Sequence, residues 1–353
     1  MSSTPPFYQK LSLNLITVAI LSVGLYYGRG LALPLLFAIL LSALLLKLVQ
    51  ILQRKGFPKF FAIFLPVTFA VLLGGIVLYF LTAQIVSFAS DLPALREKIG
   101  NTGESLQLWV NINLNIPVTN QNQLIRQAIE NLRDNVPLIA STTIGSITDV
   151  LAYITLLPIY TFLLLYYRST IKAFLISIFA KEPDESVSAI LTESIHISRQ
   201  YITGLLLETA MVFVLNTTGF LLIGIKYAIF LALLASLLNL IPYVGMLVAN
   251  VLAMLITLIS SDSLGDVLWV GIILAIVQFI DNNIGLPLIV GNKVRINSLV
   301  TILGVLIGGA LCGVLGMFLA IPVLAVTKVI CDRVPELTPW GKLIGDDVDR
   351  KKL

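Results

Sequence analysis

Charged residues are scarce in this chain of 353 amino acids, where Asp, Glu, Lys and Arg together account for only 12% of the positions. Hydrophobic residues account for 58%, and the mean hydropathy is +0.97. A soluble domain carries about 25% charged residues and could not bury this much apolar surface, so a water-soluble fold is excluded. The sequence therefore predicts a protein whose main solvent is lipid.

Histidine and cysteine are also rare, and the motifs of common enzymes are missing. The single histidine, His196, cannot furnish the usual metal-ligand sets. The chain has no phosphate-cradling Gly-rich loop ending in Lys-Ser/Thr, no paired-histidine metal helix and no serine elbow. We therefore expect no enzymatic activity, no cofactor, no metal site and no ATP-driven pump within this chain. Cys312 and Cys331 lie in or beside an apolar run, which argues against a disulfide framework.

The net charge of +4 arises from 23 basic and 19 acidic residues, which are confined to a few segments between apolar runs. A nucleic-acid-binding protein would gather its basic residues on one soluble face, so we expect a lipid bilayer as partner and no nucleic acid. Lys and Arg cluster in two short segments, at residues 47–59 and 168–181. By the positive-inside rule, these segments and both termini are expected to be cytoplasmic.

Apolar runs long enough to cross a hydrocarbon core of about 30 Å recur along the chain. The expected membrane segments are Leu11–Tyr27, Leu31–Leu52, Phe60–Phe88, Ile144–Tyr167, Gly204–Ile223, Tyr227–Ser260, Val267–Ile280 and Leu299–Ile330. They predict an all-α integral membrane protein with about eight membrane helices and a small helical extramembrane insert. Two C-terminal tracts, Tyr227–Ser260 and Leu299–Ile330, are interrupted by proline or glycine, so each is expected to be a broken or re-entrant helix or a kinked single span.

The polar segments divide the chain into six parts. We expect N-terminal membrane helices over 1–90, a helical extracytoplasmic insert over 91–140, a membrane helix over 141–167, a cytoplasmic amphipathic segment over 168–203, a membrane transport core over 204–332 and a cytoplasmic tail over 333–353. The insert is either a solvated connector or a gating or assembly element. Within the amphipathic segment, the spacing of charged and apolar residues predicts a helix along the membrane interface over Glu182–Gln200.

Polar residues inside apolar helices are the first functional signal. At 100° per residue, Glu208 and Asn216 fall on one stripe of a helix, and contact of this polar stripe with lipid would be energetically unfavourable. Intramembrane ionisable groups usually face a bundle interior or a water-filled cavity, so Glu208 is a candidate proton or cation site. Alternatively, Glu208 lies near the cytoplasmic edge and pairs with Arg199 or reaches water.

A second polar cluster follows the span Val267–Ile280. Gln278, Asp281 and Asn282 share a helix face, and Gly285 and Pro287 are expected to end this helix. A carboxylate at a helix C-terminus opposes the macrodipole and favours a nearby cation, which carbonyls freed at a broken helix can help to bind. The alternative is a structural salt bridge from Asp281 to Lys293 or Arg295. The residues predicted for the substrate and ion pathway are Glu208, Asn216, Asn239, Pro242, Gln278, Asp281, Asn282, Asn283 and Pro287.

Glycine spacing near the C-terminus is a third signal. Small residues recur four positions apart within an apolar tract, which permits close helix contact within or between protomers. The glycines predicted for helix packing are Gly304, Gly308, Gly309, Gly313 and Gly316. They favour a compact bundle and a homo-oligomer.

These motifs together resemble those of the AI-2E family of transporters, also called PerM-like permeases. The resemblance lies in the run Leu238–Gly245, in Asp281-Asn282-Asn283 with Pro287 and Gly291, in Asn297-Ser298-Leu299, and in Gly308-Gly309, Gly313, Gly316-Met317 and Ala320-Ile321-Pro322. It covers nearly the whole chain, although Asn297 stands where many family members have proline. The resemblance implies a multi-pass transporter of the bacterial inner membrane that assembles into oligomers. Family members are associated with export of autoinducer-2, and others with sodium/proton exchange.

Our leading hypothesis is a secondary transporter that exports a small, autoinducer-2-like solute coupled to an ion gradient of H⁺ or Na⁺. Its path would pass the breaks at Pro242 and at Asp281–Pro287, with Glu208 and Asp281 as coupling groups. One alternative is a cation antiporter with no organic cargo. Another is a non-transporting membrane scaffold or enzyme subunit that docks partners on the insert.

Overall fold

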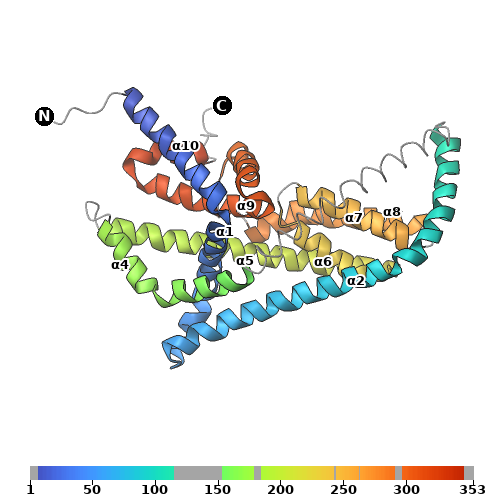
Figure 1. The fold of residues 1–353 in the computed structure, drawn as a ribbon, viewed down its shortest axis with the longest axis horizontal. Coiled ribbons are helices and arrows are strands. Elements are labelled where there is room, and N and C mark those ends of the chain that lie inside the picture. Colours follow the sequence, from blue (N-terminus) through green and yellow to red (C-terminus); the bar gives the residue numbers. More distant parts are fainter. Residues whose placement is uncertain are drawn as a thin grey trace.

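The computed structural model describes residues 7–114, 153–178, 184–241, 244–261, 263–290 and 296–345. Within these ranges the chain is almost entirely helical, with one isolated bridge between Ile296 and Gly345 and no strand (Figure 1). By length and composition, five of the helices can cross a membrane, or six if one bent pair is a single span. The predicted all-α membrane fold is confirmed.

The N-terminal helix α1 runs from Phe7 to Arg54 without interruption. The two spans expected at Leu11–Tyr27 and Leu31–Leu52 are therefore one helix, and the expected separation of these spans is wrong. The glycines at Gly28-Arg29-Gly30 do not adopt the positive φ of a tight turn, whereas Gly56, which follows α1, does so with a φ of 89°. Glycine inside a helix lowers its stability but does not by itself break it.

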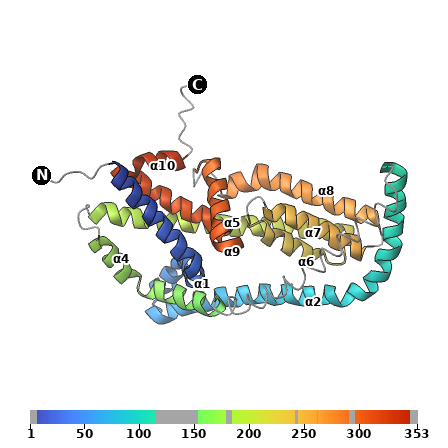
Figure 2. The same ribbon diagram turned by 45° about the horizontal axis from the view of Figure 1, so that its top comes forward.

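Helix α2 spans Lys59–Leu114 and crosses the expected boundary at residue 90 without a break. At a rise of 1.5 Å per residue it is roughly 84 Å long, about twice the full thickness of a bilayer. The start of the predicted insert is therefore a continuation of a membrane helix, and Figure 2 shows α2 bending toward its C-terminal end. Residues 115–140 of the insert and 141–152 of the next predicted membrane helix lie outside the described part of the chain. An extracytoplasmic position for the insert stays a prediction.

A sharp bend separates the next two helices. Tyr153–Tyr166 is apolar, and α4, Arg168–Ile178, leaves it at an angle of 71°. Helix α5 then runs from Asp184 to Ile223 as one element. The separate interfacial helix expected over Glu182–Gln200 is thus replaced by the first turns of α5, because Gly204 alone does not interrupt the helix. Whether 168–203 is cytoplasmic stays a prediction.

The tract Tyr227–Ser260 is a hairpin of two short helices, α6 at Ala228–Leu238 and α7 at Val244–Ser260. The two helices pack against each other, and Leu231 and Ala235 of α6 share a core cluster with Ala249 and Ala253 of α7. Figure 2 shows the two helices side by side. The kinked single span considered for this tract is therefore wrong.

Helix α8, Leu264–Ile280, continues as a π-helix, η1, over Asp281–Val290. Helix α9, Ser298–Arg333, folds back on itself at Gly313, which has φ 65° and ψ −152°. A Cβ at Gly304 would meet the Leu324 side chain, which requires the two halves to lie antiparallel. This second tract is therefore also a hairpin rather than a kinked span. The chain then forms the short helices η3, Pro335–Leu337, and α10, Thr338–Ile344.

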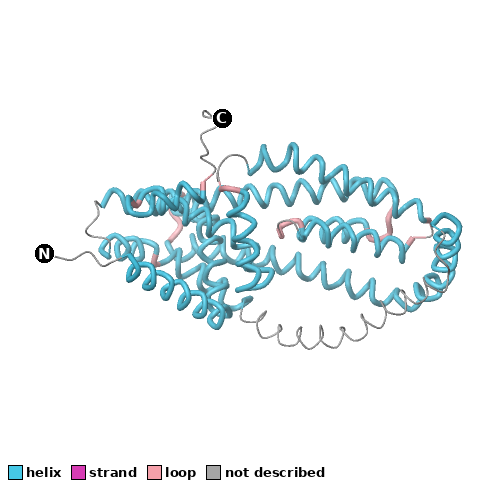
Figure 3. Tube along the Cα trace, turned by 90° about the horizontal axis from the view of Figure 1, so that it is seen from above, coloured by secondary structure: helices cyan, strands magenta, loops and turns pink. Residues whose placement is uncertain are grey.

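The largest core cluster lies between α5, α6, α7 and α8, with Phe220, Leu231 and Val270 almost fully buried. These helices run alongside one another in Figure 3. Smaller clusters join α1 to α2 and α1 to α9. The core thus places one face of α5 against the α6–α7 hairpin, where most of the predicted polar residues meet.

Candidate functional site

One face of α5 carries buried polar residues into the bundle. Glu208 is 6% exposed and Asn216 is 2% exposed, and Val212 and Phe220 of the same stripe are buried with them. The helical spacing that predicts this stripe therefore matches the structure. The Arg199 side chain contacts His196, and no cation among the described residues pairs with Glu208. The alternative pairing with Arg199 is not formed.

Asp281 lies at the junction of α8 and η1 and is only 1% exposed. Its Oδ2 accepts a hydrogen bond from Nδ2 of Asn239 at 3.2 Å. Its Oδ1 has no hydrogen-bond partner among the described residues. Asn239 caps the end of α6, so this bond ties the tip of the α6–α7 hairpin to the π-helix. Lys293 and Arg295 lie outside the described residues, so the alternative salt bridge stays a prediction.

The helix expected to end at Gly285 and Pro287 instead changes its winding. From Asp281 it continues as a π-helix through Val290. Proline lacks an N–H group and clashes with the carbonyl four residues earlier in an α-helix, so regular α-helical winding could not continue through Pro287. The expected helix end is therefore wrong, although the expected break is present in this form. Such π segments are frequent at functional sites.

Glycines allow α5 to pack directly on α8 and η1. A Cβ at Gly219 would lie 2.7 Å from Cγ2 of Ile273, and one at Gly285 would collide with Met211 of α5. This close approach brings Glu208 and Asp281 near enough for their charges to interact. Two buried carboxyl groups from different helices thus share one region of the bundle.

Next to Asn239, the hydrogen-bond partner of Asp281, lies a small cavity of about 10 Å³, close to the size of a single water molecule. Its polar lining consists of the carboxamides of Asn216, Asn239, Asn250 and Gln278. Oδ1 of Asn216 has no hydrogen-bond partner among the described residues. The cavity therefore offers amide oxygens and N–H groups next to a buried carboxylate.

Not every predicted pathway residue takes part in this cluster. Asn282 and Asn283 are exposed. Asn282 accepts a hydrogen bond from Gln278 at 3.1 Å, and Asn283 donates one to the backbone carbonyl of Phe279 at 2.8 Å. Pro242 lies outside the described residues, and only the backbone of Pro287 is described. The cluster also contains Asn250, which sequence reasoning missed. An amide in the middle of the apolar helix α7 is the same signal that identified Asn216.

The glycines near the C-terminus are used within the chain. A Cβ at Gly308 would lie 2.5 Å from the carbonyl oxygen of Gly316, and one at Gly309 would lie 2.7 Å from Cε of Met317. Together with Gly304, they let the two halves of α9 press together, and Gly313 makes the turn.

The chemistry of the cluster suits a proton or a small hard cation. Carboxylate and amide oxygens are the ligands that such cations prefer. No group of three or more His, Cys, Asp or Glu side chains in the described part of the chain could hold a transition metal. The cluster therefore differs from a transition-metal centre.

Comparison with known proteins gives a consistent result. Residues 15–336 match the model of the AI-2E family transporters. YrrI of Bacillus subtilis (strain 168), which is named as a transport protein, is 30% identical over 309 residues, covering 84% of each chain. PerM of Escherichia coli (strain K12), named as a permease, is 26% identical over 338 residues, covering 92% of this chain and 94% of its own. YhhT of the same strain, also named as a transport protein, is 23% identical over 341 residues, covering 97% of this chain and 95% of its own. This multi-pass membrane protein belongs to the AI-2E family of transporters.

Proposed function

We propose that the chain is a secondary transporter of a bacterial inner membrane that exports a small, autoinducer-2-like solute and couples this export to movement of H⁺ or Na⁺. The observation that carries the proposal is the burial of Asp281 with one oxygen of its carboxyl group unpartnered among the described residues. The carboxamide oxygen of Asn216 is also buried without a partner there. We assign the coupling role to Asp281 and Glu208.

A buried carboxylate is costly unless a proton, a cation or hydrogen bonds neutralise it. Asp281 receives one hydrogen bond, from Asn239, and has no cation partner among the described residues. Glu208 adds a second carboxyl in the same region, and two buried negative charges repel. Uptake of a proton or cation relieves this repulsion, so the charge state of the cluster depends on the ion gradient.

The Asn239–Asp281 bond connects the coupling group to a structural element that can move. Asn239 lies at the tip of a hairpin, and Asp281 starts a π-helix, which winds less favourably than an α-helix. Ion binding at Asp281 competes with the Asn239 amide for the carboxylate oxygens. We infer that this competition links ion binding to widening of the polar cavity.

Basic residues support a cytoplasmic position for the turn after α1 and the start of α4. Nη2 of Arg168 donates to Gln53 at 2.8 Å, and Lys59 lies 4.3 Å from the ring centre of Tyr166. The turn after α1 and the start of α4 therefore form one basic end of the molecule. Positive charge favours the cytoplasmic side.

The experiment is transport by purified protein in proteoliposomes with imposed pH or sodium gradients and autoinducer-2 as cargo. Asp281→Asn keeps the shape of the side chain but removes its charge, so we expect loss of gradient-driven flux with normal membrane insertion. Ile284→Ala, which changes an exposed apolar side chain on the same π-helix, is the control and should transport normally. Undiminished flux in the Asp281→Asn protein would reject the coupling role.

One observation favours a cation antiporter as a second candidate. The polar cavity of about 10 Å³ has room for a water molecule or an ion but not for an organic solute in this conformation. Exchange of sodium for protons in the same proteoliposomes, without movement of autoinducer-2, would select this candidate.

A further inference from the structure

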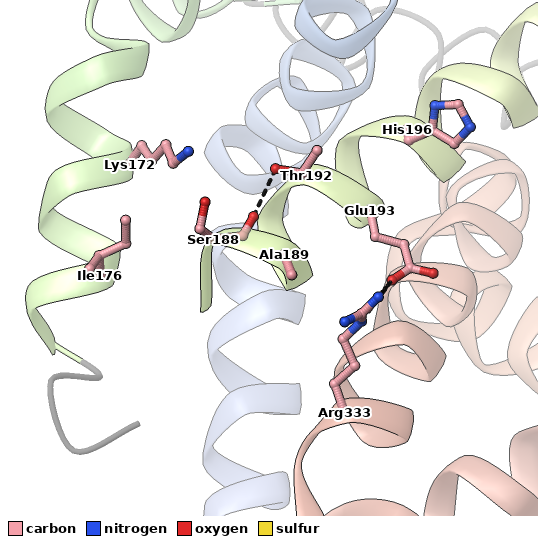
Figure 4. Close-up of a pocket in the computed structure, with 8 residues that line it drawn as sticks. All are labelled: Lys172, Ile176, Ser188, Ala189, Thr192, Glu193, His196 and Arg333. Carbon is pink, nitrogen blue, oxygen red and sulfur yellow. Dashed lines mark hydrogen bonds and ion pairs between the residues drawn. The ribbon is translucent and has the colours of Figure 1, made fainter. Parts of the chain in front are cut away.

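A groove far from the polar cluster lies between α4, the first turns of α5 and the end of α9. Its volume is about 810 Å³. Figure 4 shows its lining, which consists of Lys172, Ile176, Ser188, Ala189, Thr192, Glu193, His196 and Arg333. We propose that this groove binds the phosphate headgroup of an anionic phospholipid.

The charge of the lining favours an anion. Glu193 is the one carboxylate that lines the groove, and Arg333 of α9 already pairs with it, with its Nε 2.7 Å from Oε2. Lys172 has no ion-pair partner among the described residues, and Figure 4 shows its side chain extending toward the α5 side of the groove. The lining thus carries an uncompensated positive charge.

Hydroxyl groups stand opposite this lysine. Thr192 donates its hydroxyl hydrogen to the carbonyl of Ser188 at 2.7 Å. The Ser188 hydroxyl makes no hydrogen bond that is described, so it can donate to a phosphate oxygen. An ammonium group and a hydroxyl from two helices are a suitable pair of donors for a phosphodiester.

The position of the groove selects a lipid over a soluble anion. All three elements reach it at the end of an apolar span: α4 begins after the span Tyr153–Tyr166, Ser188 follows the start of Val187–Ile223, and Arg333 ends Ser298–Arg333. Helix α4 bends away by 71° and has no buried residue, with Phe174 60% exposed and Ile178 57% exposed. An amphipathic helix with these features lies in the headgroup region, where anionic lipids attract basic residues.

The apolar part of the lining fits the same occupant. Ile176 and Ala189 face the groove beside the polar donors. They provide contact for the glycerol backbone and the first methylenes of a lipid. A phosphate ion in water would gain nothing from this surface.

The test is native mass spectrometry of the full-length purified protein incubated with phosphatidylglycerol or with phosphatidylcholine. We expect retention of phosphatidylglycerol over phosphatidylcholine, and a decrease of about fivefold in Lys172→Gln. Lys55→Gln removes the same charge from an exposed position in the turn after α1 and should retain the lipid. Ala189→Phe fills the groove without changing its charge and should also lose it.

Three results would overturn the proposal. An equal decrease in phosphatidylglycerol retention in Lys172→Gln and Lys55→Gln would show that the lipid is attracted by positive surface charge in general and not by the groove. Equal retention of phosphatidylcholine would exclude selection by charge. Displacement of the lipid by excess glycerol 3-phosphate would show that the groove recognises a soluble phosphate instead.

Discussion

The two hairpins of the C-terminal half use the same reversal of direction for different purposes. In α9, the halves press together through glycines and the chain turns at Gly313. No Asn, Gln or charged residue occurs between Ser298 and Thr327. The α6–α7 hairpin instead carries Asn239 at its tip and Asn250 in its second helix, and both line the polar cavity. We infer that the glycine hairpin serves packing and the amide hairpin serves the pathway.

The largest effect on stability is expected at the glycine hairpin. Gly308→Leu would place side-chain atoms on the carbonyl of Gly316, where even a Cβ lies 2.5 Å away. We expect a loss of about 3 kcal/mol in the free energy of unfolding, because overpacking at backbone cannot be relieved by side-chain movement. Thermal unfolding in detergent measures it. Gly75→Leu, where no atom lies within 4 Å of the added Cβ, is the control.

A change at the tip of the amide hairpin should affect transport rather than folding. Asn239→Ala removes the described hydrogen-bond donor to Asp281. A hydrogen bond to a charged group contributes about 2 kcal/mol, so we expect gradient-driven flux to fall by roughly 30-fold. Flux assays on this variant and on Gly308→Leu, corrected for the amount of folded protein, would separate the two hairpins. A melting temperature that falls as far in Asn239→Ala as in Gly308→Leu would contradict the comparison.

A smaller change in stability is expected at the turn of the glycine hairpin. Gly313 has a positive φ but open space around it, so Gly313→Ala meets a backbone penalty without a clash. We expect a loss of about 2 kcal/mol, because this backbone conformation is accessible almost only to glycine, and a decrease in melting temperature would reveal it. A loss as large as that of Gly308→Leu would show that the turn, rather than the contact between the halves, limits stability.

The smallest effect is expected from Asn250, which lines the cavity and makes no described hydrogen bond to either carboxyl group. Asn250→Ala should reduce flux by about fivefold, corresponding to about 1 kcal/mol for one hydrogen bond. Leu255→Ala, on the exposed side of the same helix, serves as the control and should not change flux. Equal flux in both variants would remove Asn250 from the pathway.

The periodicity of the sequence predicted which residues face the interior of the bundle better than it predicted where the chain reverses direction. The buried stripe of Glu208 and Asn216 follows from the fixed 100° rotation per residue, which tertiary packing does not alter. A glycine does not by itself reveal a reversal, because its φ depends on the surrounding contacts. Gly28 and Gly30 therefore lie inside a continuous helix, whereas Gly313 turns the chain.

The candidate site was predictable in its residue types but not in its contacts. A carboxyl or amide in an apolar run must find a polar neighbour, and this identified Asp281, Asn239 and Gln278. Which residues meet depends on how the α6–α7 hairpin docks, so the Asn239–Asp281 bond could not be inferred. The same limitation explains why Asn282, on the face expected for Asp281, lies exposed.

The central claim is that Asp281 couples ion movement to transport, and solute flux measured with and without an ion gradient tests it most directly. We expect wild-type protein in proteoliposomes to move autoinducer-2 faster when a pH or sodium gradient is imposed, and the Asp281→Asn protein to show no such acceleration. Acceleration of the same size in the Asp281→Asn protein would contradict the account.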